Sequence, residues 1–143
     1  MDPKQLSDWL SAAREIGAEA GRHTVAYFRK PLDVVSKADA SPVTVADRET
    51  EELIRERLTE RFPEHGIFGE DFGTVGSDSR SLWIVDPIDG TKSFISGMPL
   101  FSTLIALYDQ QQQQSLLGVL TFPGLDEQYS AAAGQGPSAK CGN

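Results

Sequence analysis

An apolar strand that runs directly into an acidic turn is the feature that most constrains the fold of this chain. Residues 83–85 are Trp-Ile-Val, all strand formers with no polar interruption, as expected for a strand covered on both faces. Pro87 has no backbone N–H and a fixed φ, so the strand is expected to stop at Asp86. The chain should therefore turn at this point and display the carboxylate of Asp86.

The turn that follows combines two acids with a glycine and a threonine. Asp86 and Asp89 lie three residues apart and can converge on one point. Gly90 lets the backbone approach a ligand closely, and Thr91 can cap a following helical turn. Oxygen ligands beside a helix start are typical of a site for Mg²⁺ and phosphate. A plain surface turn is the alternative, because Asp-Pro and Asp-Gly are common turn dipeptides.

A second short apolar run upstream also ends in acids. Residues 67–73 read I-F-G-E-D-F-G, which places Glu70 and Asp71 between glycines. Taken alone, this pair is typical of a solvated loop. Together with Asp86 and Asp89, however, Glu70 completes the three acids that a two-metal phosphoryl-transfer site requires.

Three motifs in order give the chain a family resemblance. They are S-P-V-T-V-A-D at residues 41–47, G-E-D at 69–71 and D-P-I-D-G-T at 86–91. This combination resembles the inositol monophosphatase family of Mg²⁺-dependent phosphatases, from the first expected helix to about residue 133. Residues 92–101, K-S-F-I-S-G-M-P-L-F, are more similar to the histidinol-phosphatase branch than to the inositol branch.

The resemblance implies a metal role for four residues. Glu70, Asp86 and the backbone carbonyl of Ile88 would hold a first Mg²⁺. Asp86 would also bridge to a second ion that Asp89 helps to bind. The family pattern implies two or three Mg²⁺ ions in a complete site.

The resemblance also implies a catalytic set of Thr91, Asp47 and Glu70. The Thr91 hydroxyl would polarise the attacking water, with Asp47 as its partner. Asp89, Gly90 and Thr91 would contact the substrate phosphate. Without the resemblance, Asp47 reads as an acid in the first turn of a helix, where the helix dipole favours it. Lys37 would lie near the metals, or else be an ordinary exposed lysine.

Composition excludes several other classes of function. The 143 residues include 13 basic and 21 acidic side chains, for a formal charge of -8, which argues against nucleic-acid and anionic-membrane partners. The chain has no long apolar run, so we expect no membrane span. A single cysteine, Cys141, fits a cytoplasmic protein, and His23 and His65 lie far from the acidic motifs. A covalent cysteine or histidine phosphatase is therefore not expected.

Hydrophobic periodicity predicts two helices in the first half of the chain. The first spans residues 3 to about 28, begins after Asp2 and ends before Pro31. The second is capped by Thr44 and runs to about residue 62, before Pro63. The expected buried positions are Leu6, Trp9, Leu10, Ala13, Ile16, Gly17 and Ala20 in the first helix, and Val45, Leu53, Ile54, Leu58 and Phe62 in the second.

The second half of the chain is expected to be β-rich. Residues 102–108 and 115–122 predict an antiparallel hairpin, 128–133 a further strand, and 33–37 a strand between the helices. Helices followed by strands predict an α+β fold, with helices packed on one face of a mainly antiparallel sheet. The resemblance implies the same architecture, as in the N-terminal half of the layered inositol monophosphatase fold.

The domain organisation leaves two functional hypotheses open. Residues 1–133 are expected to form the N-terminal metal-binding domain, and 134–143 a glycine-rich tail, while the W-D-x-A motif of the family's second half is absent. The first hypothesis is a Mg²⁺-dependent phosphomonoesterase, a homodimer acting on a small alcohol phosphate, with histidinol phosphate ahead of inositol monophosphate. The alternative is a truncated, non-catalytic fragment that binds metal or dimerises.

Overall fold

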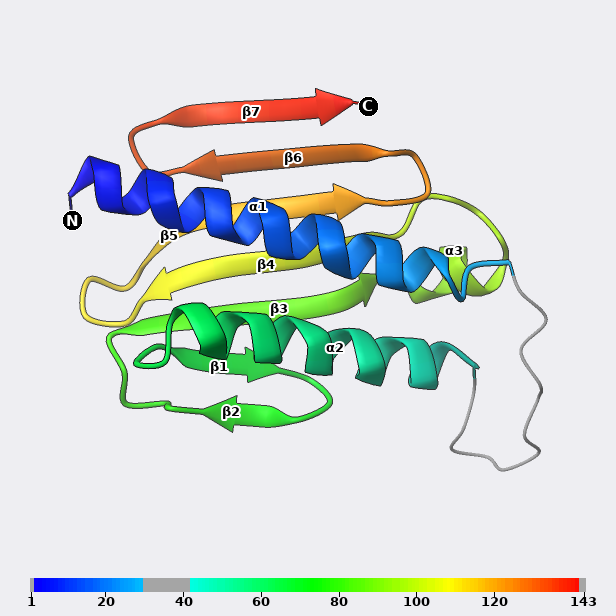
Figure 1. Cartoon of the computed structure of the whole chain (residues 1–143), viewed down its shortest axis with the longest axis horizontal. Helices are drawn as coiled ribbons and strands as arrows, with labels where there is room; N and C mark the ends of the chain where they lie inside the picture. The colour runs from blue at the N-terminus through cyan, green and yellow to red at the C-terminus, as the bar shows by residue number, and fades with distance from the viewer. Residues whose placement is uncertain (1, 30–41, 142–143) are drawn as a thin grey trace.

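Two long helices lie across one face of a mixed sheet (Figure 1). This computed structural model describes residues 2–29 and 42–141. Within those residues the elements are α1 Pro3–Val25, α2 Pro42–Arg61, β1 Gly66–Gly69, β2 Gly73–Val75, β3 Ser81–Asp89, α3 Thr91–Ile95, β4 Ser102–Asp109, β5 Gln114–Phe122, β6 Glu127–Ala132 and β7 Gly136–Cys141.

The sheet order is β2-β1-β3-β4-β5-β6-β7 across the described part of the chain. Only the β1–β3 pair among these neighbours is parallel, and the others are antiparallel. The predicted hairpin is confirmed as β4 and β5, and the further strand as β6. The fold class is therefore α+β with a mainly antiparallel sheet, as predicted. The strand expected at residues 33–37 and the candidate Lys37 lie outside the described residues.

Helix α1 follows its predicted pattern closely. Asp2 caps it by accepting a hydrogen bond from the Lys4 N–H at 3.2 Å, and the helix ends at Val25, about three residues before the expected end. A Cβ at Gly17 would lie 2.9 Å from Thr121 Oγ1, so the glycine permits close packing on β5. The predicted apolar face is buried, with Trp9 half-buried at its margin. Within the described residues, no helix is both long and apolar enough to cross a membrane.

Helix α2 buries Ile54 and Leu58 as predicted, and Phe62 packs against the core, but Val45 does not join them. The helix begins at Pro42, so the expected cap residue Thr44 lies inside its first turn, and Val45 remains 42% exposed. The end at Arg61, before Pro63, is as expected. Polar Thr50 and Glu51 are fully buried, and an apolar pattern cannot identify such positions. The buried positions are Ala46, Thr50, Glu51, Ile54 and Leu58.

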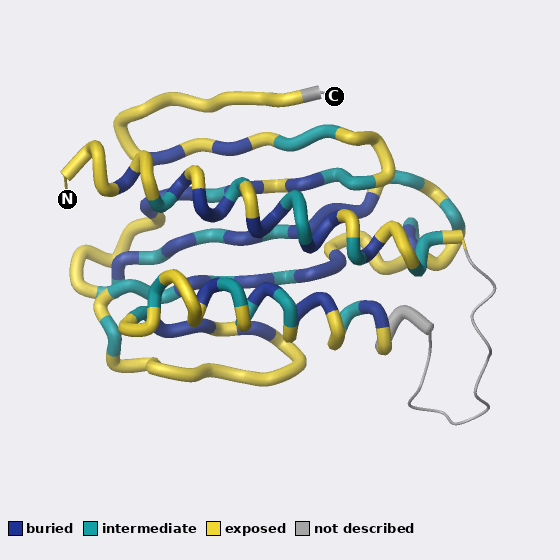
Figure 2. The backbone as a smooth tube through the Cα atoms, in the orientation of Figure 1, coloured by how far each residue is buried: buried dark blue, intermediate teal, exposed yellow. Residues whose placement is uncertain are grey.

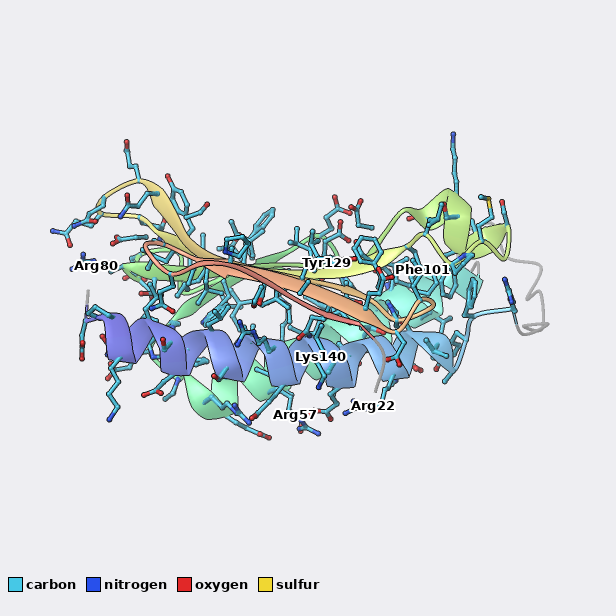
Figure 3. The ribbon with its side chains drawn as sticks, turned by 90° about the horizontal axis from the view of Figure 1, so that it is seen from above. Arg22, Arg57, Arg80, Phe101, Tyr129 and Lys140 are labelled. Carbon is cyan, nitrogen blue, oxygen red and sulfur yellow. The ribbon has the colours of Figure 1, made fainter. Side chains whose placement is uncertain are left out.

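Within the described residues, the two long helices cover β3 on one face only (Figure 3), whereas cover on both faces was expected. Trp83 and Val85 are buried against α1 and α2, while Leu82 and Ile84 on the opposite face are half-buried. Figure 3 shows both long helices on the same side of the sheet, and Figure 2 shows burial concentrated in the central strands. Residues 82–85 are all apolar because β3 lies inside the sheet, between β1 and β4.

Pro87 does not end β3 as predicted. The strand continues to Asp89 through a bulge, with Asp86 opposite Leu104 and Asp89 opposite Ser102. A bulge leaves residues out of the ladder, so the missing N–H of proline is tolerated there. The Pro87 carbonyl instead accepts a hydrogen bond from Thr103 Oγ1 at 2.8 Å.

The segment expected to be a glycine-rich tail forms part of the sheet. Gly134 and Gly136 adopt φ values of 76° and 71°, which glycine tolerates in a tight turn. The chain then reverses and Gly136–Cys141 pairs with β6 as the edge strand β7. The glycines therefore mark a hairpin turn.

Candidate functional site

Two neighbouring parallel strands bring the predicted acids to the same edge of the sheet. Gly69 of β1 pairs with Val85 of β3, so the next residues, Glu70 and Asp86, emerge side by side. The arrowheads of β1 and β3 point to one edge in Figure 1, where α2 begins and α3 lies. Crevices at the carboxyl ends of parallel strands are common ligand sites. The fold thus unites two motifs that are separated in sequence.

The β3 bulge fixes the acidic turn against a small second core. Ile88 is buried with Phe94 and Phe101 and with Ala46 of α2. The Ile88 N–H hydrogen-bonds the Asp86 carboxylate. Asp86 is consequently half-buried while Asp89 is exposed. The apolar side chain between the acids is the anchor that holds the turn in place.

Gly90 and Thr91 form the start of the short helix α3. Gly90 is its N-cap with φ 92°, and a Cβ there would lie 3.2 Å from the Leu100 carbonyl oxygen. The turn therefore requires glycine. Thr91 is the exposed first residue of α3 and does not serve as its cap, contrary to expectation.

Asp47 on α2 also lies near these carboxylates. Burial raises the pKa of Asp47 to about 7, and the charges of Asp71, Asp86, Glu51 and Glu70 add to the rise. Asp47 Oδ1 is buried and has no hydrogen-bond partner among the residues that the structure describes. Its predicted hydrogen bond to Thr91 is thus not formed through this oxygen, and the partnership stays a prediction.

The pKa values of two neighbouring acids, Asp86 and Asp71, are also raised. Burial raises the pKa of Asp86, with further contributions from Asp89 and Glu70. Burial and the charge of Glu51 likewise raise the pKa of Asp71. Converging carboxylates with an unpartnered buried oxygen suit divalent cations, which prefer oxygen ligands. In the part of the chain that the structure describes, no three acidic, histidine or cysteine side chains are already arranged around one metal position.

Asp47→Asn is expected to stabilise the metal-free protein at neutral pH. The rise of the Asp47 pKa from 3.8 to about 7 corresponds to about 4 kcal/mol, which solvent screening of this half-buried group reduces to on the order of 2 kcal/mol. The pKa of Asp47 is higher in the folded protein than in the unfolded chain. Ionisation of this carboxyl therefore lowers the free energy of unfolding of the wild type as pH rises from about 4 to 7. Thermal unfolding in a chelator should show a Tm gain of roughly 5 °C at pH 8 and little gain at pH 4.

The exposed Asp78, in the loop between β2 and β3, offers a matched control. Asp78→Asn makes the same change in net charge and should leave the Tm nearly unchanged at both pH values. An Asp47→Asn gain that is equal at pH 4 and pH 8 would contradict the electrostatic explanation.

Sequence reasoning missed Glu51, a fully buried acid on α2. It lies one helical turn after Asp47 and hence on the same side of the helix. Its carboxylate pairs with Arg55, again four residues on. The i, i+4 spacing of Asp47, Glu51 and Arg55 was the available signal, but exposed helices carry such pairs as well.

The two larger of the three cavities found among the described residues lie away from the acids. One of about 680 Å³ lies between α1 and the β5–β6 region, with Arg22, Thr121 and Gln128 among its lining. Another of about 470 Å³ lies on the face without long helices, beside Leu120 and Tyr129. Neither is lined by an acid of the site, so neither offers a pocket for an alcohol whose phosphate lies at these acids.

Comparisons with known proteins agree on one family. The sequence model of the inositol monophosphatase family matches residues 5–140. The chain is 48% identical to a histidinol-phosphatase of Chlorobaculum parvum over 89% of this chain and 49% of that protein. It is 42% identical to an inositol-1-monophosphatase of Mesorhizobium japonicum over 73% of this chain and 39% of that protein.

The fold is shared with solved structures. An inositol monophosphatase from Zymomonas mobilis superposes with a TM-score of 0.82 and 38% identity, covering 94% of this chain and 51% of that one. A structure from Anabaena described as an inositol monophosphatase gives a TM-score of 0.80 at 30% identity. The chain spans about half the length of these relatives or less.

Proposed function

The chain belongs to the inositol monophosphatase family, and we propose that it is the metal-binding half of a Mg²⁺-dependent phosphomonoesterase. The observation that carries the proposal is the convergence of Asp47, Glu70, Asp86 and Asp89 at one sheet edge. The pKa values of Asp47 and Asp86 are raised there, which is unfavourable for folding without cations. A function in binding cations explains why the chain has this unfavourable group of carboxylates.

Residues of the β1 and β3 ends would hold the metal ions. We assign Glu70, Asp86 and the Ile88 carbonyl to a first Mg²⁺, and Asp86 with Asp89 to a second. Bound Mg²⁺ would lower the pKa of a water molecule and neutralise charge on the phosphate and on the leaving oxygen. An acidic protein with a formal charge of -8 needs such cations to bind a phosphate dianion.

The remaining site residues would orient the reactants. Thr91 presents its hydroxyl to the attacking water, and Asp47 accepts the proton that this hydroxyl shares. The pKa of about 7 belongs to the metal-free protein, and bound cations would lower it by neutralising the neighbouring carboxylates. Gly90 and Thr91 at the start of α3 would direct backbone N–H groups toward the phosphate.

Histidinol phosphate is our first choice of substrate, and inositol monophosphate the second. The order follows residues 92–101 and the similarity to histidinol-phosphatases. We further propose a cytoplasmic homodimer in which this chain, with β7 as the edge strand of its sheet, forms the N-terminal metal-binding domain. One alternative is a non-catalytic metal-binding fragment, because the chain spans about half of its relatives.

Phosphate release from the purified chain tests these proposals. With histidinol phosphate and inositol monophosphate as substrates, we expect any release to require Mg²⁺ and to stop in EDTA. We expect the 143 residues alone to bind cations weakly and turn over slowly, because Mg²⁺ demands a complete oxygen shell. Release that persists in EDTA would contradict the metal-dependent mechanism. Turnover near 10 s⁻¹, about the median for enzymes, would show instead that these residues suffice.

A further inference from the structure

The fully buried carboxylate of Glu51 has a set of hydrogen bonds that tie α2 to the loop after β1. Glu51 Oε2 accepts from Arg55 Nε at 2.9 Å and from the Phe72 N–H at 3.1 Å. Glu51 Oε1 accepts from the Asp71 N–H at 3.2 Å. The two backbone donors are the first and second residues after Glu70. The carboxylate therefore binds the backbone immediately behind a proposed metal ligand.

Arg55 extends the same connection. Its side chain is largely buried and also donates to the Gly73 carbonyl oxygen. The guanidinium carbon lies 5.9 Å from the centre of the Phe72 ring. The loop is thus held by Glu51 at its amides and by Arg55 at its far end.

Gly69 fixes the other side of the loop. It is the last residue of β1 and pairs with Val85 of β3 and Gly73 of β2. A Cβ at Gly69 would lie 2.6 Å from Glu51 Cδ and Oε2 and 2.7 Å from Oε1, which no carboxylate could accept without moving. The glycine allows the carboxylate to reach the loop amides. Glu70, itself exposed, is consequently held between two anchored neighbours.

We infer that Glu51 is a positioning residue that aims Glu70 at the metal position through the backbone N–H groups of Asp71 and Phe72. This inference rests on the proposed metal-binding function. Glu51 is not itself available as a ligand, since it is fully buried and its three hydrogen bonds occupy most of its lone pairs. Residues that orient metal ligands from behind commonly alter metal affinity 10–100-fold when they are replaced.

Glu51→Gln separates this role from general stabilisation of the fold. A glutamine has one acceptor oxygen, and its NH₂ would face a backbone N–H, so one loop hydrogen bond must be lost. We expect amide hydrogen exchange at Asp71 and Phe72 to accelerate in the metal-free chain. Mn²⁺ affinity, measured by titration calorimetry of the full 143-residue chain, should fall by about 10-fold to 100-fold.

Asp109 offers a closely matched control. It is a buried carboxylate at the end of β4 that pairs with Arg80 and accepts the N–H groups of Gln111 and Gln112 at 2.9 and 3.2 Å. Asp109 lies at the opposite end of the sheet from the acids, since it pairs with Ser81 at the start of β3. Asp109→Asn should therefore change stability without changing Mn²⁺ affinity.

Gly69→Ala provides a second, independent test. The added methyl displaces the Glu51 carboxylate from the loop and should reproduce the loss of Mn²⁺ affinity. Unchanged affinity in both Glu51→Gln and Gly69→Ala, with wild type binding Mn²⁺, would overturn this inference alone. A wild-type chain with no Mn²⁺ affinity would overturn the proposed function and this inference with it.

Discussion

Asp86→Asn is expected to lower the affinity of the chain for divalent cations by at least about 100-fold and to remove Mg²⁺-dependent phosphate release. Asp86 is the side chain assigned to both metal ions, so loss of its charge weakens both positions together. Replacing groups that only orient metal ligands typically costs 10–100-fold in affinity, and a bridging ligand should matter no less. Titration with Mn²⁺ and an assay at limiting Mg²⁺ would measure the two effects.

Unfolding cannot explain the expected loss, because the metal-free variant should be at least as stable as wild type. Burial and the charges of Asp89 and Glu70 raise the Asp86 pKa, so the neutral amide relieves an unfavourable charge. The asparagine oxygen can still accept the Ile88 N–H. The exposed Asp78→Asn variant controls for the change in net charge. Full turnover by Asp86→Asn at limiting Mg²⁺ would refute the assignment of Asp86 as a bridging ligand.

The sequence predicted that acids follow the ends of two strands because the motifs that indicate this depend on local chemistry. An apolar strand followed by Asp-Pro and Asp-Gly indicates where carboxylates leave the sheet. The parallel register of β1 and β3 then sets Glu70 beside Asp86, a relation between segments that periodicity does not specify. The order of the motifs suggested this convergence, and the register explains it.

The failed predictions share a physical cause in tertiary context. Pro87 should have ended the strand, but a bulge accommodates it and Thr103 satisfies its carbonyl. Val45 was expected in the core because it is apolar, whereas α2 buries Glu51 instead. The energy of burying Glu51 is balanced by Arg55 and two loop amides that lie about 20 residues later in the chain. Local pattern cannot anticipate partners of that kind.

The buried carboxylates of the site lower the free energy of unfolding, and other parts of the fold must compensate for this. The carboxylates of Asp47, Asp71 and Asp86 all have raised pKa values, and burial is the first cause in each. Proteins commonly keep such unfavourable groups where function needs them. The opposing contribution comes from the larger core, in which Trp83, Ile54 and Leu58 are fully buried. Stability and metal binding are thus expected to change in opposite directions when these acids are neutralised.

Thr91→Ala is expected to lower kcat by about 100-fold or more while leaving divalent-cation affinity close to wild type. The hydroxyl is proposed to orient the attacking water, and positioned proton-transfer groups typically contribute 10²-fold to 10⁴-fold. Thr91 is exposed at the start of α3, where Gly90 provides the cap, so its removal should barely affect folding.

Thr91→Ser separates the hydroxyl from the methyl group of the same side chain. Serine keeps the hydroxyl and should retain most of the turnover measured at saturating Mg²⁺, while alanine should not. Asp47 Oδ1 has no hydrogen-bond partner among the described residues, so this oxygen can still accept one. If kcat and metal affinity instead fell in parallel in Thr91→Ala, the residue would act through the metal position, and its role toward water would be wrong.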